Sequence, residues 1–132
     1  MTDLVNHPPH YTEHPAFSME CHDLCRMMTF DAGNATKYLW RVFAKGAPEE
    51  NIRKALWYLD RVEMPHRITL RWDEKIEQKA ITEAGQFIIR AADQPVQRAA
   101  VYAISCLVRG DAFAAADNAR RALALLNEGA TR

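Results

Sequence analysis

The sequence predicts an all-α protein, a compact helical bundle of about five to six helices with an extended N-terminal arm. Apolar residues recur at three- and four-residue spacing along most of the chain, which is the period of an amphipathic helix. Proline and glycine fall between these stretches, where such residues end one helix and begin the next. No segment alternates polar and apolar residues for long, so we expect no sheet.

The arm covers residues 1–15, where Pro8, Pro9 and Pro15 disfavour helix both at themselves and at the preceding residue. A first helix is expected over about 17–28, with Ser18 as a candidate cap. A second helix follows over about 31–44.

The third helix has a clear start. Gly46 breaks the preceding element, and Pro48 suits the first position of a helix. Glu49 and Glu50 follow, where the helix dipole favours acidic side chains. Pro65 ends this helix.

Three further helices are expected in the second half of the chain. A stripe of apolar residues predicts a helix over 73–91, and Asp93-Gln94-Pro95 is a typical start for a helix through Val108. After Gly110-Asp111, a last helix is expected from about Ala112 to Leu126. The last two helices form either a hairpin that closes the core or a face for a dimer.

Length and charge exclude several classes of function. With 132 residues the chain fits one domain, or one domain plus a small helical extension, and we divide it into residues 1–65 and 66–132. Seventeen basic residues balance 17 acidic ones, which argues against a general nucleic-acid binder. No apolar stretch is long enough for a membrane span, and the N-terminus is unlike a signal peptide, so we expect a cytoplasmic protein.

Cations and tyrosines share one face on each of two neighbouring predicted helices. The first face holds Asn34, Lys37, Tyr38 and Arg41, and the second holds Lys54, Tyr58 and Arg61. This spacing, at i, i+3, i+4 and i+7, places side chains on one side of a helix. The two faces together predict a site for a ligand that carries a phosphate and a ring.

Such a ligand needs positive charge and directed donors. Arg41 offers a planar fork, while Lys37, Lys45 and Lys54 offer point charges. The pair Gly33-Asn34 near a helix start is expected to add backbone N–H donors. The alternative is that these cations form an ordinary solvated face.

The carboxylates Glu20 and Asp23 lie three residues apart on the first predicted helix. This spacing suits Mg²⁺ held between protein and phosphates, although acids near a helix start also stabilise the helix dipole. His10 is either a general base, a phosphate partner or a capping donor beside Tyr11.

The three cysteines are expected to be reduced thiols, with Cys106 a small core residue. Cys21 and Cys25 share a helical face and, with His7, His10 or His22, are an alternative zinc site. Their spacing is not a standard one for zinc.

The motifs also carry a resemblance, which covers roughly residues 5–62. They are Val5-Asn6-His7-Pro8-Pro9-His10-Tyr11, Glu20 and Asp23, Gly33-Asn34-x-x-Lys37-Tyr38-x-x-Arg41, and Lys54-Ala55-x-x-Tyr58. In this order they resemble a small bacteriophage domain family, long catalogued as of unknown function, that includes a podovirus nucleotide kinase. Relatives usually have Glu-Asp before the last helix of the pattern, where this chain has Glu50-Asn51.

The resemblance implies a phage protein of nucleotide metabolism, in an infected or lysogenic bacterial host cell. The implied reaction is phosphoryl transfer to a deoxynucleoside monophosphate, with Mg²⁺ as cofactor. Its catalytic residues would be His10, Lys37 and Arg41; its nucleotide-binding residues Tyr11, Asn34, Tyr38, Lys45, Lys54 and Tyr58; and its metal ligands Glu20 and Asp23. No Walker-type phosphate-binding loop occurs, so transfer would depend on positioning and charge neutralisation.

Two alternatives differ in class from a kinase. One is a non-enzymatic phage effector that binds a host or defence protein through its helices. The other is an all-α nucleotide pyrophosphohydrolase, an enzyme class that uses acid pairs on helices. In each case we expect a homo-oligomer, because several aromatic residues look exposed.

Overall fold

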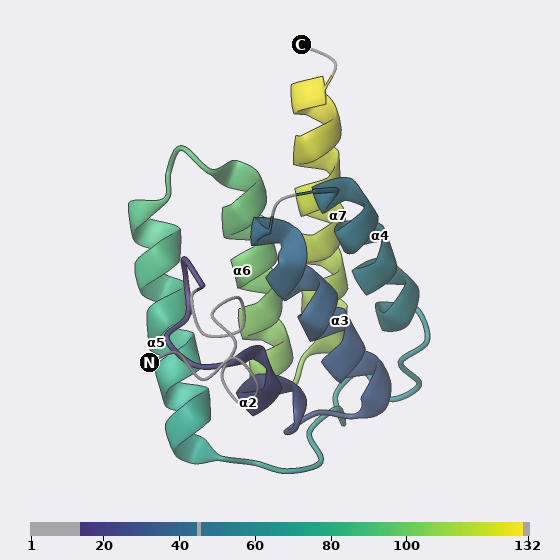
Figure 1. Cartoon of the computed structure of the whole chain (residues 1–132). Helices are drawn as coiled ribbons and strands as arrows, with labels where there is room; N and C mark the ends of the chain where they lie inside the picture. The colour runs from purple at the N-terminus through teal and green to yellow at the C-terminus, as the bar shows by residue number, and fades with distance from the viewer. Residues whose placement is uncertain (1–13, 45, 131–132) are drawn as a thin grey trace.

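The structure, a computed structural model, describes residues 14–44 and 46–130 (Figure 1). Within these ranges the chain forms six α-helices and one 3₁₀ turn, and the all-α prediction is confirmed. The elements are α2 (Cys21–Cys25), α3 (Phe30–Trp40), η1 (Arg41–Phe43), α4 (Pro48–Leu59), α5 (Glu74–Arg90), α6 (Pro95–Val108) and α7 (Ala112–Ala130). The only extended pairing in this part of the chain is an isolated antiparallel bridge between Met28 and Thr69.

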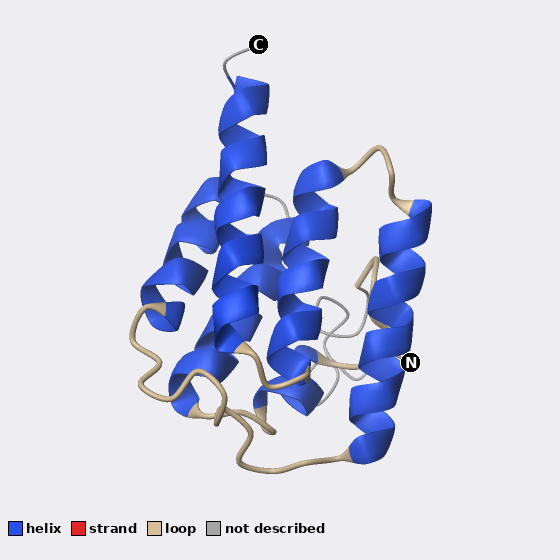
Figure 2. Ribbon diagram, turned by 180° about the vertical axis from the view of Figure 1, so that it is seen from behind, coloured by secondary structure: helices blue, strands red, loops and turns tan. Residues whose placement is uncertain are grey.

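Helix α6 forms the centre of the bundle, between α5 and α7, and it also packs against α3 (Figures 1 and 2). Its residues Val101, Ile104 and Leu107 are fully buried. Helix α7 meets α6 through Ala115, Ala119 and Ala122, which are small and fully buried. Alanines at i, i+4 and i+7 form a narrow stripe, which lets the two helix backbones come close.

The two parts of the chain contribute to one hydrophobic core. Helix α4 packs against α7, and α3 packs against α6, so helices from before and after residue 65 are in contact. No helix of the described residues is long and apolar enough to cross a membrane.

The first expected helix is much shorter than predicted. Helix α2 covers only Cys21–Cys25, because its N-cap Glu20 is extended and a capping box fixes the start. Ser18 does not cap a helix; its hydroxyl donates to Glu83 on α5 at 2.6 Å. Phe17 and Met28 are buried in the core from the segments on either side of α2.

The starts of the later helices agree closely with the sequence pattern, whereas several helix ends differ from it. Helix α5 begins after the N-cap Asp73, whose side chain accepts two backbone N–H groups, and α6 begins at Pro95. The second expected helix ends in a 3₁₀ turn, α4 ends at Leu59 well before Pro65, and α7 continues past Leu126.

A connection of 14 residues between α4 and α5, residues 60–73, crosses one end of the bundle (Figure 1). It bonds to the turn before α3, since Thr29 N–H donates to the Ile68 carbonyl at 2.7 Å. It also bonds to the start of α7, since Ala112 N–H donates to the Pro65 carbonyl at 2.9 Å. Ile68 is buried, and it anchors the connection to the core.

Candidate functional site

The ring of Tyr38 on α3 lies at the centre of three cations. Lys37 Nζ is 4.6 Å from the ring centroid, Lys54 Nζ is 5.5 Å away and Arg41 Cζ is 5.7 Å away. Lys54 reaches the ring from α4, which packs directly against α3. We call Lys37, Tyr38, Arg41 and Lys54 the cationic cluster.

Two tyrosines connect the helices at this cluster. The Tyr38 and Tyr58 rings stack with centroids 5.8 Å apart and planes inclined by 14°. Tyr58 lies one turn after Lys54 on α4, so i, i+4 spacing brings both side chains toward α3. Phe30 and Trp57 contact the Tyr58 ring edge-on. The tyrosines therefore stack on each other rather than leaving a slot between them for a base.

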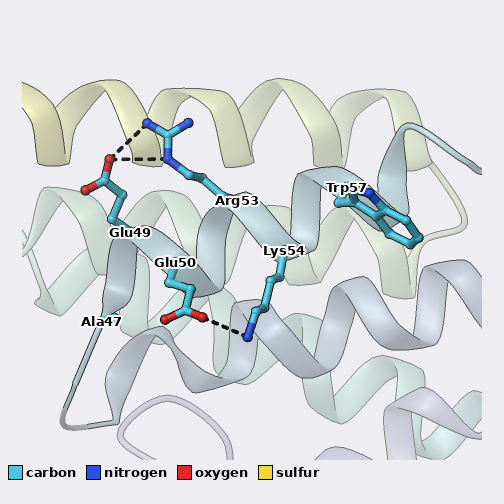
Figure 3. A pocket seen from close by; sticks show the side chains of 6 residues that line it. All are labelled: Ala47, Glu49, Glu50, Arg53, Lys54 and Trp57. Atoms are coloured by element: carbon cyan, nitrogen blue, oxygen red, sulfur yellow. Dashed lines mark hydrogen bonds and ion pairs between the residues drawn. The ribbon is translucent and has the colours of Figure 1, made fainter.

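An open groove of about 480 Å³ lies on the outer face of α4, next to the cationic cluster (Figure 3). Its lining residues are Ala47, Glu49, Glu50, Arg53, Lys54 and Trp57. Lys54 belongs to both the groove and the cluster, so the two adjoin at this residue.

Ion pairs in the groove run along α4. Lys54 Nζ lies 2.9 Å from Glu50 Oε1, and Arg53 Nη2 lies 2.9 Å from Glu49 Oε1 (Figure 3). The hydrogen bond to Glu50 raises the pKa of Lys54. Both pairs are exposed, and exposed ion pairs contribute little to stability, so breaking either pair costs little free energy.

Lys37 and Arg41 differ from Lys54, because no ion pair among the described residues involves either of them. Arg41 is exposed and Lys37 is half-buried. Within residues 14–44 and 46–130, two cations of the cluster thus have no carboxylate partner.

Two thiols lie close to the cations Lys37 and Arg41 of the cationic cluster. Cys21 and Cys25, at the two ends of α2, share an S–H···S hydrogen bond with sulfurs 3.5 Å apart. This hydrogen bond, and then the field of Lys37, lower the pKa of Cys25, while the same hydrogen bond and burial raise the pKa of Cys21. Arg41 also acts on Cys21 electrostatically. The sequence placed these cysteines on one face but gave no sign that they adjoin the cationic cluster.

The Asn34 side chain bonds within α3, since its nitrogen donates to the Phe30 carbonyl at 2.9 Å, one turn earlier in the same helix. The expectation that Gly33 and Asn34 offer free N–H donors is wrong for Gly33. Helix α3 begins at Phe30, and the Gly33 N–H bonds to the Thr29 carbonyl at 2.8 Å.

Glu20 and Asp23 form a reciprocal capping box at the start of α2, in which Asp23 Oδ2 accepts from the Glu20 N–H at 3.1 Å. The capping box gives both acids a structural role, whereas the sequence offered the helix dipole as the alternative to metal binding. The described residues contain no group of three or more His, Cys, Asp or Glu that could hold a metal ion.

Asn51, which stands where the family resemblance implies Asp, lies near the start of α4. Its side-chain nitrogen donates to the Arg41 carbonyl at 3.3 Å and so ties α4 to the end of α3. Glu50 and Trp57 are additions that the structure makes to the site. Glu50 could have been predicted as a site residue from its i, i+4 spacing to Lys54, which favours an ion pair between the two on a helix.

His10, Tyr11 and Lys45 lie outside the described residues, so the structure does not place these three predicted site residues. No family model, curated protein or solved structure matches this chain, and the resemblance to the phage family stays a prediction from its motifs.

Proposed function

We propose that this protein binds a nucleotide, with the phosphate at the cationic cluster and the remainder of the ligand along the groove. The supporting observation is the convergence of Lys37, Arg41 and Lys54 on Tyr38, with two of these cations lacking a carboxylate partner among the described residues.

Each side chain suits part of such a ligand. The guanidinium of Arg41 offers two parallel donors to phosphate oxygens, and the ammonium groups of Lys37 and Lys54 supply charge. Trp57 lines the groove and is 50% exposed; the Arg61 guanidinium covers one face of its ring at 3.3 Å from the centroid, so a base would use the other face.

The reaction that we propose is phosphoryl transfer to a deoxynucleoside monophosphate, which rests on the family resemblance. Binding is supported by the geometry of the cluster, whereas transfer is supported by the motifs alone. A pyrophosphohydrolase would release pyrophosphate and a monophosphate from a triphosphate, so product analysis separates the two enzymes.

Isothermal titration calorimetry with deoxynucleoside monophosphates and with nucleoside triphosphates, with and without Mg²⁺, tests the binding. We expect saturable heat, and about tenfold or greater weakening in Arg41→Ala and in Lys37→Ala, because a charge-assisted hydrogen bond contributes about 1.5–3 kcal/mol. Lys79→Ala, which removes an exposed cation from α5, is the matched control and should bind as the wild type does. Absence of heat with every nucleotide, or equal affinity in all variants, would refute the proposal.

A second candidate function is protein binding, as expected of a phage effector. The end of the bundle crossed by the α4–α5 connection carries five exposed large apolar side chains: Phe30, Met64, Leu70, Trp72 and Phe113. A host protein, a defence protein or a second copy of the chain are the partners to consider. A complex that Leu70→Ser with Trp72→Ser abolishes, in a protein inert toward nucleotides, would favour this function over the first.

A further inference from the structure

The two thiols of α2 are arranged for mutual reaction. Cys21 and Cys25 are free, half-buried, and have sulfurs only 3.5 Å apart. The third thiol, Cys106, is buried in α6 beside Asn118 and far along the chain from this pair. The pair therefore differs from Cys106 both in access to solvent and in having a second sulfur in contact.

The surroundings of the pair act on the Cys25 sulfur in opposite directions, because its S–H donates to the Gly33 carbonyl at 3.2 Å while the Lys37 ammonium acts on the sulfur electrostatically. The Cys21 hydrogen bond and the Lys37 ammonium stabilise negative charge on the Cys25 sulfur and lower its pKa, against the cost of burial. Two half-buried free thiols whose sulfurs are in contact, with a cation nearby, are a usual setting for redox-sensitive cysteines.

We propose that Cys21 and Cys25 form a redox-active dithiol, which a hydroperoxide converts to an intramolecular disulfide beside the cationic cluster. Cys25 is the residue oxidised first, and Cys21 resolves the product. The existence of this dithiol is independent of nucleotide binding; only its effect on affinity rests on the proposed function.

The atoms balance in two steps. The Cys25 thiolate attacks one oxygen of the hydroperoxide, the O–O bond breaks, and the leaving alkoxide takes a proton to give an alcohol; Cys25 becomes a sulfenic acid. The Cys21 sulfur then attacks the Cys25 sulfur, the S–O bond breaks, and water leaves with the Cys21 proton. Two thiols and one hydroperoxide thus yield one disulfide, one alcohol and one water.

The disulfide does not fit the helix as it stands. Side chains at i and i+4 of an α-helix have Cβ atoms about 5–6 Å apart, whereas a disulfide needs about 3.5–4.5 Å. Helix α2 is one short turn, so closing this gap distorts most of it.

The distortion reaches α3 because the two helices touch closely. The Cys25 carbonyl oxygen lies 3.2 Å from where a Cβ on Gly33 would be, and the Cys25 thiol also contacts the Gly33 carbonyl at 3.2 Å. Gly33 lies one turn before Lys37 on α3. We therefore expect oxidation to loosen α2 and to weaken ligand binding at the cluster.

The test uses the full chain, reduced and then treated with hydrogen peroxide. Intact mass and a thiol titration should show a loss of two hydrogen atoms and a fall from three free thiols to one, and peptide mapping should join Cys21 to Cys25. Amide hydrogen exchange over residues 21–28 should rise on oxidation and return after reduction.

Variants separate the two cysteines. Cys21→Ser should stop at a sulfenic acid on Cys25, captured by dimedone, and Cys25→Ser should react at least about tenfold more slowly. Cys106→Ser should react as the wild type does, and circular dichroism confirms that each variant is folded. Retention of three thiols, labelling of Cys106 at the same rate, or disulfides only between chains would overturn the proposal.

Calorimetry on the oxidised protein separates the two proposals. A disulfide that forms in a protein without nucleotide affinity would leave the dithiol standing and remove the nucleotide function. Nucleotide binding without disulfide formation would leave the nucleotide function standing and remove the dithiol. Equal nucleotide affinity in reduced and oxidised protein would overturn the coupling through α2.

Discussion

At the scale of single residues, His14 links the stability of the fold to pH. Its ring lies against Trp40 and Phe43, with centroids 4.3 Å and 4.4 Å away. Nδ1 accepts from the Ala16 N–H at 3.0 Å, and Nε2 lies 3.3 Å from the Trp40 carbonyl. This arrangement needs a neutral imidazole with its proton on Nε2, since a proton on Nδ1 would face the Ala16 N–H.

Burial lowers the pKa of His14 from 6.5 to about 4, and the hydrogen bond to the Trp40 carbonyl opposes this shift in part. Between these values the unfolded chain binds more protons than the folded one, so the free energy of unfolding falls as pH drops from about 6.5 to about 4. The full loss is about 3 kcal/mol.

Urea denaturation at a series of pH values measures this slope. His14→Phe keeps an aromatic ring but has no titrating group, so it should flatten the slope in this window while it lowers stability at neutral pH through the lost hydrogen bonds. His22→Gln, which removes an exposed imidazole, is the control. An unchanged slope in His14→Phe would contradict the assignment.

At the scale of elements, two helical glycines lie in opposite surroundings. A Cβ on Gly85, within α5, would meet nothing within 4 Å, whereas a Cβ on Gly33 would lie 3.2 Å from the Cys25 carbonyl oxygen. We expect Gly85→Ala to raise the free energy of unfolding by about 0.5–1 kcal/mol, because alanine costs less backbone entropy in a helix.

Gly33→Ala gains the same helix propensity but crowds α2 against α3, so its net stabilisation should be smaller than that of Gly85→Ala, or negative. Chemical denaturation of the two variants beside the wild type measures the difference. Equal stabilisation at both positions would show that α2 moves away from a Cβ at position 33 without cost, which would contradict the expected crowding.

Local signals explain which elements the sequence predicted well. The Asp73 cap and Pro95 act within a few residues of the helix start, so the beginnings of α5 and α6 were predicted closely. Helix α2 starts at the local capping box of Glu20 and Asp23, while the expected cap Ser18 bonds instead to Glu83, 65 residues away. Long-range contacts of this kind leave no periodic trace in the sequence.

The same distinction holds for the site. Helical spacing was enough to group Lys37 with Arg41, and Lys54 with Tyr58, on single faces. That these faces meet at Tyr38 depends on how α3 packs against α4, which spacing does not specify. The acids at α2 illustrate the limit, because a metal pair and a capping box have the same sequence pattern.

At the scale of the whole molecule, one core joins the two parts of the chain. Leu39 on α3 and Leu107 on α6 are both fully buried in it. We expect Leu39→Ala and Leu107→Ala each to cost roughly 2–5 kcal/mol and to shift one common unfolding transition. Tryptophan fluorescence and far-ultraviolet circular dichroism recorded on the same samples check this. Separate transitions for the two probes would instead show that residues 1–65 and 66–132 unfold independently, as expected if the second part were a separate C-terminal extension.

The position of Trp57 gives the molecule a built-in optical sensor. Its indole borders the groove at 50% exposure, whereas Trp40 is shielded at 6% and Trp72 sits at the far end of the α4–α5 connection. Replacing Trp72 with phenylalanine would leave one solvent-accessible emitter, so occupancy of the groove could be followed by quenching, without attaching a dye.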